Sequence, residues 1–114
     1  MKHYRPWGTY EILITRKNYQ VKKLILNPKQ STSLQYHQYR SEHWIIVSGT
    51  AHIIVGNQCK EEQMEEGSHI FINKNQVHRI RNRSRLRLEV IEIQQGNYLE
   101  EDDITRLYDE YGRT

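Results

Sequence analysis

The chain has 114 residues, the size of one ordinary domain, and we expect residues 1–114 to form a single domain. Its 17 Lys and Arg against 14 Asp and Glu leave a net charge of +3, which suits an anionic ligand without requiring one. A single cysteine, Cys59, excludes an internal disulfide and a thiolate metal cage. No apolar run approaches the roughly 18 residues of a membrane span, and no signal-peptide pattern opens the chain, so we expect a cytoplasmic protein without membrane contact.

Short runs of β-branched and aromatic residues follow one another from residue 10 to residue 94, separated by polar or Gly-containing turns. This pattern predicts an all-β sandwich or small barrel. The predicted strands cover residues 10–15, 19–26, 32–38, 43–48, 51–56, 68–73, 77–82 and 86–94. Hairpin turns are predicted at residues 48–50, 56–57 and 73–75, because Gly and Asn tolerate positive φ. The acidic run 61–66 is interpreted as a solvated strand edge.

The pattern changes after Gly96. Ile104, Leu107, Tyr108 and Tyr111 recur at helical spacing, and acidic residues precede them where they would favour a helix N-terminus. Gly112 then stands where a helix would end. The sequence therefore predicts one short amphipathic helix after the last strand.

A polar cluster lies between residues 34 and 43. Gln35 and His37 are two apart on a predicted strand, so their side chains point to the same face. Glu42 begins the next strand, and His78 opens a later one. Two imidazoles, a carboxylate and an amide oxygen suit Zn²⁺, Mn²⁺, Fe²⁺ or Co²⁺. Any one of these histidines is more often an ordinary hydrogen-bonded residue, and only their joint spacing favours a metal site.

That joint spacing resembles the two motifs of the cupin family. The first motif places two ligands two apart, then a glutamate and a glycine, and the second supplies a histidine and an asparagine. The matching residues are Gln35, His37, Glu42, Gly49, Gly67, His78 and Asn82. Gln35 stands where most cupins have His, a variant found in phosphomannose isomerases. The usual Pro and Gly of the second motif are replaced by Asn73 and Asn75.

Longer runs resemble the type II mannose-6-phosphate isomerase domain: residues 5–11, 33–51, 78–82 and 91–113. In that family the domain is usually fused to a mannose-1-phosphate guanylyltransferase, but this chain has no Gly-rich nucleotidyltransferase loop. The resemblance implies an all-β cupin double-stranded β-helix, a jelly-roll barrel, with the short C-terminal helix. It also implies a homodimer that interconverts mannose 6-phosphate and fructose 6-phosphate through an enediol.

The ligands implied for the divalent ion are Gln35, His37, Glu42 and His78. Zn is the first choice of metal, and Mn, Co and Fe are alternatives.

The catalytic base is sought among the carboxylates of residues 86–94. Glu89 and Glu92 fall on opposite faces of this strand, so only one can point into the barrel, and we favour Glu92. Arg106, in a DDITR stretch similar to one bearing a catalytic arginine in larger phosphomannose isomerases, is a further catalytic candidate. His43, on the face opposite Glu42, is an outside candidate for the base.

Two further arginines are candidates for binding the substrate phosphate. Arg40 is favoured because larger phosphomannose isomerases carry a Lys at a similar distance after the ligand histidine. Arg79 lies beside His78 but points to the opposite face of its strand.

Two other functions remain open. A nucleotide-sugar epimerase or ketoisomerase on this fold would be marked by a His-Asp pair, and a non-catalytic sugar-phosphate-binding module would keep the ligands without turnover. The alternating arginines of residues 79–87 lack the interleaved aromatics that stack on bases, so we expect a sugar-phosphate ligand and no nucleic acid.

Overall fold

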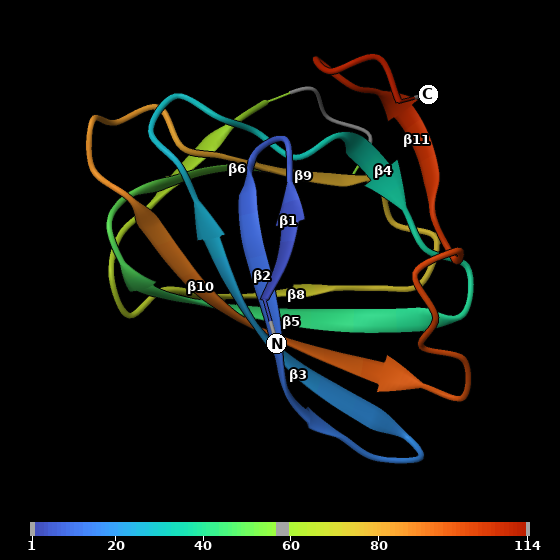
Figure 1. Ribbon diagram of the computed structural model, residues 1–114. Helices are drawn as coiled ribbons and strands as arrows, with labels where there is room; N and C mark the ends of the chain where they lie inside the picture. Colours follow the sequence, from blue (N-terminus) through green and yellow to red (C-terminus); the bar gives the residue numbers. More distant parts are fainter. Residues whose placement is uncertain (1, 57–59, 114) are drawn as a thin grey trace.

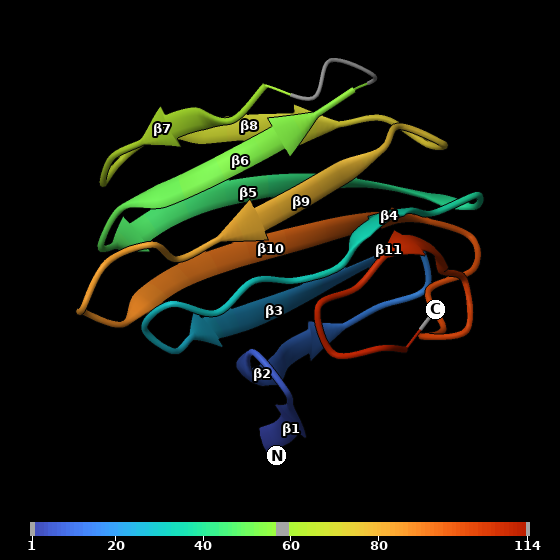
Figure 2. The same cartoon turned by 90° about the horizontal axis from the view of Figure 1, so that it is seen from above.

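The computed structural model describes residues 2–56 and 60–113, and its described residues form two antiparallel sheets that face each other (Figures 1 and 2). The all-β prediction is confirmed. The strands are β1 (Lys2–Arg5), β2 (Gly8–Thr15), β3 (Tyr19–Leu26), β4 (Leu34–Tyr36), β5 (Arg40–Ser48), β6 (Ala51–Val55), β7 (Glu62–Met64), β8 (His69–Ile72), β9 (His78–Arg81), β10 (Leu88–Gly96) and β11 (Thr105–Tyr108).

The larger sheet has the strand order β1-β2-β3-β10-β5-β8, and the smaller sheet has the order β11-β4-β9-β6-β7. The chain therefore changes sheet several times. The turns at residues 48–50 and 73–75 join strands of different sheets, so the prediction that they close hairpins is wrong. Gly49 and Asn75 do adopt the positive φ expected there, at 94° and 63°. β6 and β7 pair across the third predicted turn, in which Asn57, like Cys59, lies outside the described residues.

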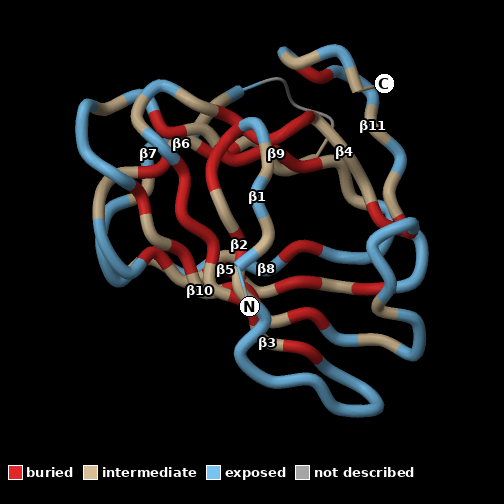
Figure 3. Tube along the Cα trace, viewed as in Figure 1, coloured by how far each residue is buried: buried red, intermediate tan, exposed pale blue. Residues whose placement is uncertain are grey.

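Strand alternation decides which side chains enter the space between the sheets. Along β5, Glu42, Trp44 and Ile46 are buried while the intervening residues are partly exposed, and β10 shows the same alternation (Figure 3). The apolar part of the interior includes Leu26, Ile53, Ile72, Ile80 and Leu88. Polar side chains line the rest of the interior, including side chains of β4 and β11. These two strands lie side by side at one edge of the smaller sheet (Figure 2).

The predicted C-terminal helix is wrong: the described residues contain no helix, and Thr105–Tyr108 form β11. This strand pairs with β4, so the backbone groups on that side of it are satisfied by a neighbouring strand. An isolated helix of this length is marginal in water, which allows sheet pairing to override the helical spacing. Tyr111 instead packs against the core, and its hydroxyl donates to Gln30 Oε1. No helix among the described residues is long and apolar enough to cross a membrane.

Candidate active site

A cavity of about 350 Å³ lies between the two sheets. Its walls come from β1, β2, β3, β5 and β10 of the larger sheet, from β4, β9 and β11 of the smaller one, and from the segments next to these strands. Trp7, Leu24 and Ile80 supply apolar surface, and most of the remaining lining is polar or charged. The cavity is large enough for one sugar-sized ligand.

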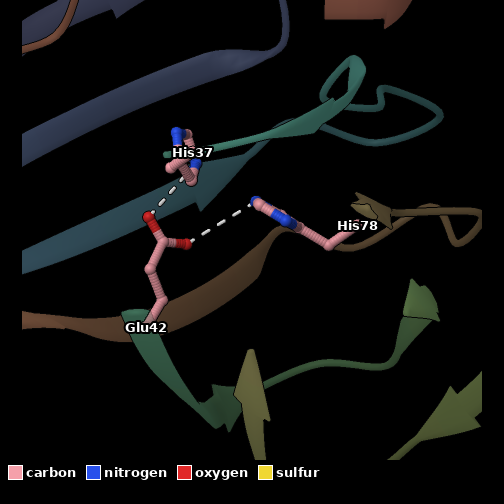
Figure 4. A group of neighbouring side chains, drawn as sticks. All are labelled: His37, Glu42 and His78. Atoms are coloured by element: carbon pink, nitrogen blue, oxygen red, sulfur yellow. Dashed lines mark ion pairs between the residues drawn. The ribbon is translucent and has the colours of Figure 1, made fainter. Parts of the chain in front are cut away.

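Three of the four predicted ligands point toward one another in this cavity: His37, Glu42 and His78 (Figure 4). All three are buried, and their candidate ligand atoms lie within 4.8 Å of one another. Glu42 Oε2 is 3.3 Å from His37 Nε2, and Glu42 Oε1 is 3.7 Å from His78 Nε2. The spacing in the sequence thus corresponds to proximity in space, because β5 and β9 lie in facing sheets and His37 directly follows β4.

Backbone carbonyls set the tautomer of both histidines. His37 Nδ1 donates to the carbonyl oxygen of Asp103 at 2.7 Å, and His78 Nδ1 donates to that of Gln76 at 2.9 Å. In the neutral ring, each Nε2 then carries a lone pair directed at the cluster. Burial, with Arg40 and His78, lowers the pKa of His37 from 6.5 to about 3, so this ring is neutral at pH 7.

Arg40 begins β5 and lies against the same cluster. Its Nε donates to Glu42 Oε2 at 2.8 Å, and its Nη2 is 3.3 Å from His37 Nε2. Burial opposes the charge, but Glu42 and Glu92 raise the pKa of Arg40 above its ordinary value. Its Nη1 is buried without a hydrogen-bond partner among the described residues. Arg40 therefore lines the cavity, and its guanidinium already forms an ion pair with the Glu42 carboxylate.

The two carboxylates of β10 differ in burial and in whether they line the cavity. Glu92 is buried and lines the cavity, whereas Glu89 is half-buried and does not. Glu92 Oε1 accepts a hydrogen bond from Gln94 Nε2. The Oε1 atom of Gln94 in turn accepts a hydrogen bond from Gln20 Nε2. Burial, and next the Glu42 charge, raise the pKa of Glu92, while Lys22 lowers it. A buried carboxylate with a raised pKa is a better proton acceptor than an exposed one, which suits it to general-base catalysis.

Gln35 and Arg106 also line the cavity. Gln35 is paired directly with His78 on one side and with Arg106 on the other. The side-chain nitrogen of Gln35 donates to the carbonyl of Ser33 at 3.4 Å, which leaves the amide oxygen for another partner. Arg106 thus lies on a strand rather than on the expected helix.

The remaining candidates lie away from the cavity lining. Arg79 is buried on the other face of β9, where it donates to the carbonyl of Thr32 and its guanidinium lies 5.1 Å from the centre of the Tyr108 ring. His43 contacts His69 and Gln95 on the outer face of the larger sheet. Asn82 donates to three backbone carbonyls, those of Leu26, Asn27 and Leu86, and so holds a turn.

Several cavity residues were not singled out from the sequence: Arg5, Tyr10, Lys22, Glu101, Asp102 and Arg113. One signal was available for Lys22. It lies two residues from both Gln20 and Leu24 along β3, so the three side chains share one face of the strand, and that face is buried. In the structure Lys22 lies 4.4 Å from the centre of the Tyr10 ring and forms an ion pair with Glu101 at 2.5 Å. The others come from the ends of the chain, and only the tertiary fold brings them to the site.

The chain is similar to known proteins over nearly its whole length. The chain is 44% identical over 113 residues to the xanthan biosynthesis protein XanB of Xanthomonas campestris, covering 99% of this chain and 24% of that protein. It is 39% identical over 110 residues to the mannose-1-phosphate guanylyltransferase ManC of Salmonella typhimurium, covering 96% of this chain and 22% of that protein. The chain spans about a quarter of the length of these relatives.

Solved structures confirm the cupin double-stranded β-helix. Oxalate decarboxylase from Bacillus subtilis superimposes with a TM-score of 0.82 at 16% identity, covering 100% of this chain and 31% of that one. This likeness shows the fold alone. The model of the family described as "Mannose-6-phosphate isomerase C-terminal" matches residues 1–109, and the chain belongs to this family.

Proposed function

We propose that the protein is a metal-dependent sugar-phosphate isomerase that interconverts mannose 6-phosphate and fructose 6-phosphate. The observation that supports this most is the convergence of His37, Glu42 and His78 in a cavity that also contains the buried carboxylate of Glu92. Family membership agrees with it, and the relatives include a mannose-1-phosphate guanylyltransferase, which acts on a related sugar phosphate.

The donor set fits a divalent ion. The candidate ligand atoms of two imidazoles and one carboxylate lie close enough together to bind one ion. The amide oxygen of Gln35 is the fourth proposed ligand atom. The Arg40 guanidinium lies beside this donor set, hydrogen-bonded to Glu42 and close to His37. Zn²⁺ is our first choice, with Mn²⁺, Co²⁺ and Fe²⁺ as alternatives. A bound divalent ion would polarise a substrate carbonyl and stabilise the negative charge of an enediolate.

Glu92 is the proposed base. Glu42 is paired directly with Gln94 across β5 and β10, and Glu92 is two residues along the same face, so the two carboxylates are diagonal neighbours, with Cα atoms roughly 7–8 Å apart. Glu92 would take the proton from C2 of the open-chain aldose, and the electrons of that C–H bond form the C1–C2 double bond of the enediol. The π electrons of C1=O move to O1, which takes up a proton to complete the enediol. Loss of the O2–H proton then lets its electrons form the C2=O bond, while the C1–C2 π electrons take the proton held by Glu92 at C1. The ketose results with no net gain or loss of protons or electrons.

Arg40 is proposed as a substrate-binding residue beside the cluster. Its buried Nη1 faces no described partner, so a hydroxyl or carbonyl oxygen of the sugar could accept a hydrogen bond from it. Its bond to Glu42 also holds the carboxylate in place.

A coupled isomerase assay on mannose 6-phosphate tests the proposal, run on protein treated with EDTA and then supplied with Zn²⁺, Mn²⁺ or Co²⁺. We expect turnover that depends on the metal, and deuterium at the exchanging carbon in D₂O. His37→Ala and His78→Ala should lose both metal and turnover, whereas His69→Ala, on the outer face, should keep both. Metal-loaded protein without turnover on mannose or glucose 6-phosphate would contradict the isomerase function.

That negative result would support the second candidate, a sugar-phosphate-binding module. The third candidate, a nucleotide-sugar epimerase or ketoisomerase, is less well supported. It requires a histidine paired with an aspartate carboxylate, but the Nδ1 atoms of His37 and His78 both bond backbone carbonyls.

We also propose a homodimer, because β1, β7, β8 and β11 lie at sheet edges and paired edges avoid open hydrogen-bonding groups. Light scattering at micromolar concentration tests this, and a monodisperse monomer would contradict it. A cytoplasmic location stays a prediction from the sequence.

A further inference from the structure

Arg106, Gln35 and His78 form a row across three neighbouring strands. Arg106 of β11 is paired directly with Gln35 of β4, and Gln35 is paired directly with His78 of β9. Direct partners point to the same face of a sheet, and all three residues line the cavity. Because strands are spaced about 4.8 Å apart, the backbones of Arg106 and His78 are on the order of 10 Å apart. This span is comparable with the length of an open-chain hexose phosphate.

The Arg106 guanidinium has no carboxylate or other hydrogen-bond partner among residues 2–56 and 60–113, and its Nε is buried. Burial, and next the charge of Arg113, lower the pKa of Arg106; Arg5 acts in the same direction, while Asp109 and Glu101 raise it. A partly buried cation beside two like charges is stabilised by an anion.

Arg5 and Arg113 line the same cavity. Arg5 donates to the carbonyl of Tyr4 and to the hydroxyl of Tyr10, both neutral acceptors, so its charge is not neutralised by a bonded carboxylate within the described ranges. Arg113 uses Nε and Nη2 on Asp109. Three guanidinium groups thus share one directly bonded carboxylate at this part of the cavity.

We propose that Arg106, with Arg5 and Arg113, forms an anion subsite that binds the phosphate group of the substrate. The proposal rests on the proposed sugar-phosphate function of the same cavity. It assigns the phosphate to residues from both ends of the chain rather than to Arg40, whose Nε is bonded to Glu42. The reacting C1 and C2 atoms then lie at the other end of the row, beside His78, His37 and Glu92.

Calorimetric titration of EDTA-treated protein with inorganic phosphate, mannose 6-phosphate and unphosphorylated mannose tests the subsite. Arg106→Gln and Arg5→Gln should each weaken phosphate and mannose 6-phosphate binding roughly tenfold to hundredfold, the effect of losing a charge-assisted hydrogen bond. Arg85→Gln removes the same charge from an exposed turn outside the cavity lining and should bind phosphate as the wild type does. Arg106→Lys keeps the charge, so it should recover part of the loss if the arginine acts through charge. Thermal unfolding of each variant shows that the protein is folded.

The outcomes separate the subsite from the isomerase function. Phosphate binding that requires Arg106, in a protein that shows no turnover with any metal, would support the subsite and overturn the isomerase. Turnover with an unchanged KM for mannose 6-phosphate in both Arg106→Gln and Arg5→Gln would overturn the subsite and leave the isomerase intact. Wild-type protein that binds neither inorganic phosphate nor mannose 6-phosphate would overturn the subsite.

Discussion

The carbonyl oxygen of Asp103 accepts a hydrogen bond from His37 Nδ1 at 2.7 Å, across 66 positions of sequence. The Asp103 carboxylate accepts two more, from the backbone N–H groups of Gln38 and Tyr39, at 2.9 and 3.0 Å. One buried residue before β11 therefore holds both the ring of a proposed metal ligand and the turn that follows it. This is the outer-sphere support that metal-binding histidines generally have.

Asp103→Ala should weaken metal binding roughly 10- to 100-fold, the usual cost of losing an outer-sphere partner. The carbonyl remains in this variant, but the turn at residues 38–39 loses both carboxylate contacts, so His37 is no longer held in one position. Competition of Zn²⁺ with a chromogenic chelator measures the effect.

Glu100→Ala is the matched control for Asp103→Ala, because it removes another carboxylate from the same loop. The Glu100 side chain is exposed and makes no hydrogen bond to a described residue. Equal metal affinity in Asp103→Ala and wild type would show that the turn does not need this support.

Glu92→Gln should lower kcat roughly 10²- to 10⁴-fold with little change in metal content, because the amide cannot take a proton from the substrate. It should not destabilise the fold, since burial already opposes a charge at this position. Steady-state kinetics of the metal-loaded variant measure the effect. Glu89→Gln makes the same change on the opposite face of β10. A loss of kcat in Glu89→Gln but not in Glu92→Gln would show that the base does not act from inside the cavity.

Asp109 should contribute to stability in a way that depends on pH. Its carboxylate accepts hydrogen bonds from the backbone N–H, Nε and Nη2 of Arg113, which lower its pKa from 3.8 to about 2. The unfolded chain therefore binds a proton at higher pH than the folded one, so the stabilisation is complete above about pH 4 and is lost as the pH falls towards 2.

Asp109→Asn should thus lower the free energy of unfolding at pH 7 by roughly 1 kcal/mol, with a difference from wild type that shrinks between pH 4 and pH 2. Urea unfolding at a series of pH values measures this. A difference that stays constant from pH 7 to pH 2 would show that the Asp109 charge is not what stabilises the C-terminal segment.

Gly8→Ala should destabilise the fold more than Gly67→Ala. A Cβ atom at Gly8 would lie 1.9 Å from the carbonyl oxygen of Ile25, where β2 pairs with β3, so backbone would have to move. Gly67 also has positive φ, but a Cβ there meets no atom within 4 Å. We expect a loss of roughly 1 kcal/mol for Gly67→Ala, from backbone conformation alone, and a larger loss for Gly8→Ala. Chemical unfolding compares them, and equal losses would contradict the close approach of β2 and β3.

Much of the site follows from local sequence. Alternation along a strand has a period of two, so Glu42, Trp44 and Ile46 share one face whatever the strand packs against, and Glu92 falls opposite Glu89 for the same reason. The all-β fold follows from the same short alternating runs. The resemblance of the motif spacing to cupins then identified the residues that the structure brings together as His37, Glu42 and His78.

Only the tertiary structure decided the rest. Residues 104–111 fit a helix by spacing, but β4 offers an unpaired edge, and the backbone of so short a segment gains more from that strand than from an isolated helix. The turns at residues 48–50 and 73–75 have the local conformations of tight turns, yet whether they join partners in one sheet or pass between sheets depends on distant strands. Arg5 and Arg106 come from the two ends of the chain to line the cavity, and Asp103 contacts His37 across 66 positions of sequence. Such contacts carry no local periodicity, because they depend on how the two sheets and the chain ends meet in space.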